Sequence, residues 1–178
     1  AVDESRHDRR RAQVDDQVVI DAAERGPVVL GMAGRDRAMS YRLGIGTGFR
    51  AGELRSLKPE DFNLTANPPT VTVSAAYSKR RREDVQPIRA DLAELLTSWI
   101  ADKPRCEPVL ALPDKAAKMM RVDLRRARAA WIREISGKKE RRQRCEADFL
   151  RAVDRQGRVC DFHSLRHTYI TRLISSGA

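Results

Sequence analysis

Three short polar segments of the sequence carry side chains that can bind a phosphate or transfer a proton. The first, residues 47–54, reads Thr-Gly-Phe-Arg-Ala-Gly-Glu-Leu, so a glycine-rich break precedes Arg50 at the start of a helix. Glu53 follows three positions later on the same side of that helix, where a carboxylate can fix the direction of the guanidinium. Taken alone, the pair also fits an ordinary, weak surface ion pair.

The second segment, residues 163–167, reads His-Ser-Leu-Arg-His. His163 and Arg166 are three positions apart and therefore share one face of a helix, while apolar residues form another face. That apolar face consists of Phe162, Leu165, Tyr169 and Leu173. The pattern predicts two polar groups that point away from the core together, although an isolated histidine and arginine on a helix are often only solvated.

The third segment is a basic run in which Lys79 is followed by Arg80, Arg81 and Arg82. It lies between two short apolar runs, which places it at the tip of a predicted hairpin. Such a tip either clamps a phosphate or forms a solvated turn, and the spacing fits both.

Hydrophobic spacing predicts the helices that must position these segments. Apolar residues recur with helical period at 14–24, at 35–45, in a short stretch that stops before Pro59, and at 92–100. A longer helix is expected from Pro113, capped by Asp114, to Ile135. The last helix begins near Asp161 or Phe162, after a turn at Gly157.

Strict alternation of apolar and polar residues at 71–75 predicts a half-buried strand, and residues 85–88 predict its partner across the basic tip. Pro87 cannot donate to a sheet ladder, so it is expected at an edge or at the end of its strand. The predicted fold class is therefore mainly α with a small antiparallel β-sheet (α+β).

The composition favours a nucleic-acid partner. The chain has 178 residues, enough for one domain with a hydrophobic core, and 35 basic against 25 acidic residues give a net charge of +10. A membrane surface is the rival partner, but no stretch is apolar over the ~18 residues that a spanning helix needs, and we expect no membrane contact. The odd number and wide spacing of Cys106, Cys145 and Cys160 predict free thiols.

In this order and with these elements, the three segments resemble the catalytic domain of the tyrosine recombinase (phage integrase) family. The match comprises Thr-Gly-x-Arg-x-x-Glu-Leu at residues 47–54, a lysine on a hairpin before Val-Gln-Pro-Ile at 85–88, and His-x-Leu-Arg-His-Thr at 163–168. The first and third boxes are specific as a pair, and the resemblance covers the chain from about Val14 onward.

The resemblance implies a role for each residue. Arg50 and Arg166 would bind the non-bridging oxygens of the scissile phosphate, His163 would assist proton transfer, and Lys79 would protonate the leaving 5′ oxygen. Glu53 would hold Arg50. Two guanidinium groups can neutralise the charge that develops on the phosphorus, so we expect neither a metal nor a cofactor.

Further residues around these boxes have lesser roles. Arg80, Arg81 and Arg82 are expected to bind DNA. His167 either contacts DNA or packs locally, and the sequence leaves both open. Tyr169 follows the third box where the family has an aromatic packing residue, so we expect it in the core and not as the nucleophile.

The nucleophilic tyrosine, which would form the 3′-phosphotyrosine link, is expected beyond residue 178. Residues 1–12 are interpreted as a charged linker and residues 13–178 as a catalytic domain that is truncated at its C-terminus. The expected partner is double-stranded DNA, with a homo-tetramer on DNA at full length and a cytoplasmic, nucleoid-associated location. The alternatives are a non-catalytic DNA-binding module derived from an integrase and a helical RNA-binding protein.

Overall fold

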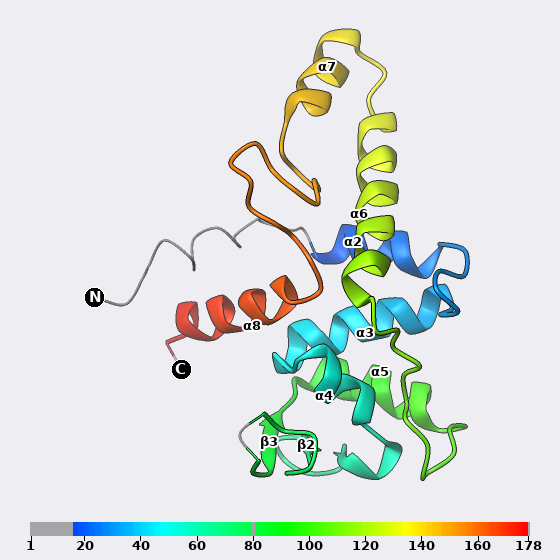
Figure 1. The fold of residues 1–178 in the computed structure, drawn as a ribbon, viewed down its shortest axis with the longest axis vertical. Coiled ribbons are helices and arrows are strands. Elements are labelled where there is room, and N and C mark those ends of the chain that lie inside the picture. The colour runs from blue at the N-terminus through cyan, green and yellow to red at the C-terminus, as the bar shows by residue number, and fades with distance from the viewer. Residues whose placement is uncertain (1–15, 80, 178) are drawn as a thin grey trace.

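The computed structural model describes residues 16–79 and 81–177, and it is built mostly of helices with one small sheet (Figure 1). The helices are α2 (Asp16–Glu24), α3 (Gly34–Thr47), α4 (Ala51–Ser56), α5 (Ala90–Ile100), α6 (Ala116–Arg133), α7 (Lys138–Glu146) and α8 (Ser164–Ser175). A 3-10 turn (Pro59–Asp61) and the strands β1 (Phe62–Asn63), β2 (Thr70–Val73) and β3 (Asp84–Pro87) lie between α4 and α5. The predicted fold class is confirmed.

The sheet is antiparallel in the order β1-β2-β3, and the predicted hairpin forms its larger part. Val71 and Val73 are buried, as the alternation predicted, but the strand ends at Val73 because a tight turn follows. The expected extension to Ala75 is wrong, since the N–H groups of Tyr77 and Ser78 both donate to the carbonyl of Ser74. Pro87 lies at the end of the edge strand β3, and the two-residue strand β1 was not predicted.

The predicted helices are present with shifted ends. Residues 14 and 15 of the first one, and the predicted linker at 1–12, lie outside the described residues. The long helix α6 starts at Ala116, and the prediction of Asp114 as its cap is wrong, because that carboxylate lies 3.2 Å from Arg55 in an ion pair. The last helix starts two or three residues later than expected, since the carboxylate of Asp161 accepts the N–H of His163 and forms a turn.

Helix α3 lies at the centre of the fold and contacts α2, α4, α5 and α8. It carries buried side chains on most of its circumference, including Tyr41 and Leu43, so it lacks the one-sided pattern of a surface helix. Its C-terminal end leads directly into the first of the three polar segments. The position of α3 therefore sets the position of Arg50.

A fully buried ion pair fixes α3 against its neighbours. The guanidinium of Arg37 donates to both carboxylate oxygens of Asp123 on α6, at 2.9 and 3.0 Å. Its remaining N–H groups reach three backbone carbonyls, those of Ala23, Pro27 and Met32, at 2.7 to 3.1 Å. Every donor nitrogen of this buried guanidinium therefore has a hydrogen-bond partner. The network also links α2, α3 and α6.

The hydroxyl of Tyr41, one turn along α3, completes the network by donating to Asp123 at 2.7 Å. Burial, and then the negative charge of Asp123, raise the pKa of Tyr41 far above its ordinary value, so the phenol stays protonated and remains a donor.

Replacing one partner of this pair tests its structural role. We expect Arg37→Ala to lower the free energy of unfolding by about 3–5 kcal/mol, because it leaves the carboxylate of Asp123 buried and uncompensated. Urea denaturation followed by circular dichroism measures the change. The control is Arg89→Ala, which breaks the exposed pair with Asp91 and should cost less than about 1 kcal/mol. Equal costs for the two variants would contradict the role of Arg37.

The three cysteines are free, as predicted, but they differ in environment. Cys106 and Cys145 are exposed, whereas Cys160 is fully buried just before α8. Burial raises the pKa of the Cys160 thiol to about 12, with the carboxylate of Asp161 acting in the same direction.

Thiol alkylation should therefore distinguish the cysteines. Because the reactive species is the thiolate, Cys160 should resist iodoacetamide at pH 8 in the folded chain while Cys106 and Cys145 react. Intact-mass spectrometry should show two adducts in buffer and three in urea. Rapid addition of a third adduct to the folded chain would show that the packing around Cys160 is wrong.

Candidate active site

A glycine at the end of α3 makes the turn into the first polar segment. Gly48 has a φ of 67°, the left-handed conformation that ends many helices, and its N–H donates to the carbonyl of Gly44 at 3.1 Å. The hydroxyl of Thr47 donates back to the carbonyl of Leu43 and accepts the N–H of Phe49. The Thr-Gly pair thus closes α3 and turns the chain toward Arg50.

Arg50 and Glu53 form a closed arrangement at the start of α4. The backbone N–H of Arg50 donates to one carboxylate oxygen of Glu53 at 2.7 Å, and its guanidinium donates to the other at 2.9 Å. The side chain of Glu53 is 6% exposed and that of Arg50 is 39% exposed. The predicted pairing is present, with a buried carboxylate that holds a guanidinium facing outward.

The structure brings the third segment against this turn. Arg166, on the first turns of α8, donates through Nη1 to the carbonyl oxygen of Gly48, although 118 positions separate the two residues. Gly48 is two residues from Arg50. The two arginines that the sequence singled out are therefore positioned by the same short loop.

Tyr169 holds α8 close to both α3 and the sheet. A Cβ at Gly48 would lie 2.4 Å from the Tyr169 ring, so a side chain at position 48 would displace either the ring or the loop. The tyrosine hydroxyl donates to the side-chain oxygen of Gln86 on β3 at 3.1 Å. The expectation that Tyr169 lies in the core is wrong, because the side chain is only partly buried and packs against Gly48 at the edge of the fold. No pattern in the sequence pointed to the contact with Gln86.

The two histidines lie at the start of α8. His163 precedes the helix, one turn from Arg166, and its ring meets that of His167 edge-on at 5.1 Å between centroids. Both side chains are partly exposed. His167 therefore has a local packing contact, which was one of its two predicted roles, and its exposed part leaves the other possible.

The described residues of the basic hairpin tip are exposed to solvent. Lys79 is exposed, as are Arg81 and Arg82, and Arg80 lies outside the described residues. The structure thus brings Arg166 to the turn that precedes Arg50, with Glu53 paired to Arg50 and His163 one turn from Arg166. The convergence of Lys79 on these residues stays a prediction.

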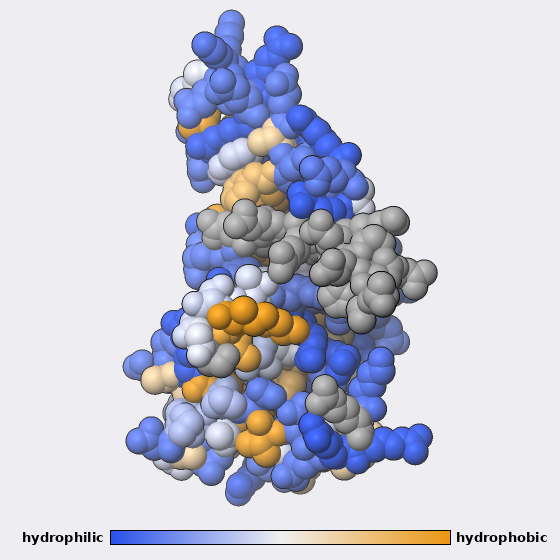
Figure 2. Space-filling view, turned by 90° about the vertical axis from the view of Figure 1, so that its left-hand side faces the viewer, coloured by the Kyte–Doolittle hydropathy of each residue, from blue (hydrophilic) through white to orange (hydrophobic). Residues whose placement is uncertain are grey.

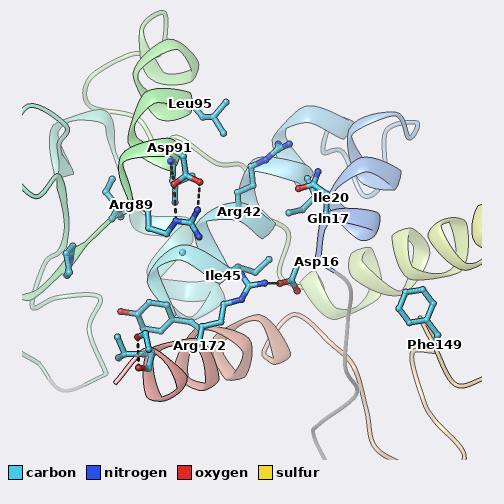
Figure 3. A pocket seen from close by; sticks show the side chains of 17 residues that line it. Asp16, Gln17, Ile20, Arg42, Ile45, Arg89, Asp91, Leu95, Phe149 and Arg172 are labelled. Atoms are coloured by element: carbon cyan, nitrogen blue, oxygen red, sulfur yellow. Dashed lines mark hydrogen bonds and ion pairs between the residues drawn. The ribbon is translucent and has the colours of Figure 1, made fainter. Parts of the chain in front are cut away.

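A separate groove of about 1050 Å³ lies between α2, α3, α5 and α8 (Figure 3). Its wall combines apolar side chains such as Ile45 and Leu95 with the ion pair between Arg172 and Asp16. Tyr169 borders this groove, but none of the predicted catalytic side chains does. The sequence did not predict the groove, because its lining comes from helices far apart in the chain.

The fold and the comparisons with known proteins identify the family of this chain, the phage integrases or tyrosine recombinases. The model of the phage integrase family matches residues 21–178, and the chain belongs to this family. A crystal structure of XerA recombinase is similar over 95% of this chain, with a TM-score of 0.53 and 16% sequence identity, which shows a shared fold. The similarity covers 53% of the XerA chain, so this chain spans about half its length.

No curated protein matches the sequence. Among the described residues, none of the helices combines the length and the apolar character needed to cross a bilayer.

The contact between Gly48 and Tyr169 generates a prediction about the site. Gly48→Ala should destabilise the chain by about 2–4 kcal/mol, because it adds left-handed strain of about 1–2 kcal/mol and a steric overlap with the ring. Urea denaturation of a double-mutant cycle with Tyr169→Ala gives the measurement. The second substitution makes room for the new methyl, so the double variant should cost less than the two single changes added together. Simple additivity would contradict the contact.

Proposed function

We propose that this chain is the catalytic domain of a site-specific DNA recombinase, which cleaves and rejoins strands through a 3′-phosphotyrosine intermediate in the full-length protein. Residues 1–178 would bind double-stranded DNA and would not supply the nucleophile. The single observation that supports this most is the hydrogen bond from the guanidinium of Arg166 to the carbonyl of Gly48, two residues before Arg50.

Two guanidinium groups beside one loop suit a phosphodiester. Each guanidinium has five N–H donors, and the contacts with Glu53 and Gly48 use one nitrogen of Arg50 and one of Arg166. The remaining donors can bind the non-bridging oxygens and stabilise the charge that grows on them during attack at phosphorus. Glu53 pre-orients one guanidinium and the carbonyl of Gly48 the other, so little ordering remains to be done when DNA binds.

His163 and Lys79 complete the proposed chemistry. His163, one turn from Arg166, would assist proton transfer at the phosphate. Lys79 would protonate the leaving 5′ oxygen. Because this lysine is exposed on the hairpin, it would reach that oxygen when the hairpin tip and the DNA approach each other. Arg80, Arg81, Arg82 and His167 would contact the DNA backbone. In the full-length protein we place the domain in a homo-tetramer on DNA, in the cytoplasm at the nucleoid.

One observation favours a second candidate, a non-catalytic DNA-binding module derived from an integrase. Lys79, Arg81 and Arg82 are all exposed at the hairpin tip, as expected of a tip that only binds phosphates. Such a module would bind duplex DNA with a steep salt dependence, about −0.9 in log K per log of salt concentration for each phosphate contacted. It would show no chemistry that depends on Arg50.

A nicked suicide substrate tests the proposal. The full-length protein should form a covalent adduct with a nicked duplex carrying its target site, detected as a shifted band on a denaturing gel. Arg50→Ala and Arg166→Ala should each slow adduct formation by about 100-fold or more, because each removes a donor to the developing charge. Binding of the duplex should change much less.

The matched control is Arg55→Ala, on the same helix as Arg50. Its guanidinium donates to the carbonyls of Leu112 and Pro113, so it holds a loop and faces away from the Gly48 turn. This variant should keep the cleavage rate within a few-fold. Absence of any adduct would favour the binding module, and equal losses of binding and cleavage would argue against the roles of the two arginines.

A further inference from the structure

The end of α6 and the whole of α7 form a projection that we name the basic arm, residues 128–146. In α6 the described buried residues stop at Ala127, and α7 has none. Figure 1 places the arm at one end of the long axis of the molecule, with the β2–β3 hairpin at the other end and α4 and α8 between them. Within the arm only Trp131 packs against the hydrophobic core, so the many charged residues of α7 need another explanation.

Arginine side chains attach the arm to itself and to the segment that follows it. Arg128 donates to the carbonyl of Cys145 at 2.9 Å and also to that of Phe149. Arg144 lies over the ring of Trp131, 4.7 Å from its centre, and donates to the carbonyl of the same residue. The rings of Trp131 and Phe149 are 4.8 Å apart. These contacts hold α7 in one orientation, so the arm has a defined structure.

The two lysines at the start of α7 do not stabilise the arm. Helix α7 contains five basic and two acidic residues. Lys138 and Lys139 stand in its first turn, where positive charge opposes the helix dipole. Arg142 forms an ion pair with Glu146 one turn later at 3.0 Å, and 83% of its side chain is still exposed. Charges that cost the helix stability are most simply explained by a polyanion that binds to them.

We propose that this arm is a second DNA-contacting surface, in which Lys138, Lys139 and Arg142 bind phosphates of the duplex that flanks the cleaved strand. The inference rests on the proposed function and adds a second contact region to it. Helix α6 is about 27 Å long, which corresponds to about eight base pairs along a duplex. Under this proposal a duplex laid along the long axis would meet the hairpin, the arginine pair and the arm in turn. Figure 2 shows that hydrophilic residues predominate on the surface at the end of the molecule that carries the arm.

Charge neutralisation with a matched control tests the arm. The arm variant is Lys138→Gln with Lys139→Gln and Arg142→Gln. The control variant, at exposed positions in the loop between α5 and α6 and in the first turn of α6, is Arg105→Gln with Lys115→Gln and Lys118→Gln. The two variants carry the same net charge, so a difference between them reports position.

Fluorescence anisotropy with a 30-base-pair duplex, measured from 50 to 200 mM salt, gives the affinities. The arm variant should lower the slope of log K against log salt by about two to three, and the affinity at 100 mM salt by about tenfold or more. The control should change both far less. Replacing the two lysines by arginine should leave both unchanged. Equal effects of the arm and control variants would overturn the arm as a specific surface.

Lysine acetylation read by mass spectrometry gives a second readout on the unmodified chain. Duplex DNA should protect Lys138 and Lys139 and leave Lys115 and Lys118 reactive. Protection of Lys79 alone would overturn the arm and leave the proposed function standing. A chain that binds no duplex at low salt would remove the proposed function itself, and protection of the arm by structured RNA but not by duplex DNA would overturn the choice of partner.

Discussion

The buried ion pair between Arg37 and Asp123 is the interaction on which the rest of the structure depends. A guanidinium without solvent is tolerated only when each of its donors has a partner, and here two carboxylate oxygens and three carbonyls supply them. Those partners belong to α2, to the loop after it and to α6. Because a displacement of any one would leave a charge unsatisfied, the network permits one arrangement of the three helices.

Because the ion pair fixes the start of α3, it also fixes the position of the residues at the C-terminal end of this helix. The helix runs from the ion pair to Gly48, where the left-handed turn delivers Arg50 and exposes a carbonyl oxygen to Arg166. The ring of Tyr169 fills the space that a side chain at position 48 would need. Two arginines that would repel each other in isolation are therefore held near each other by an acceptor each, Glu53 for one and a backbone carbonyl for the other.

Local spacing predicted the elements, and it could not predict their long-range contacts. The pairing of Arg50 with Glu53 follows from a separation of three positions, and the hairpin follows from alternation at Val71 and Val73. The contact of Arg166 with Gly48 joins segments far apart, so only the family resemblance indicated it. Arg37 was missed because a charged residue on a helix normally faces solvent, and Asp123, its partner, is 86 positions away.

The number of basic residues is a poor guide to the charge available for DNA. Much of the excess of +10 consists of arginines that hold the backbone together, such as Arg37 in the core, Arg55 on the loop before α6, and Arg128 and Arg144 in the arm. A guanidinium has five N–H donors and can bind several carbonyls at once. Arginine side chains can therefore hold backbone segments in place where there is little apolar packing. Lysines that oppose the dipole of their own helix, such as Lys138 and Lys139, are therefore a better indicator of where a polyanion binds. Together with Lys79 on the hairpin they mark the two ends of the binding surface that we propose.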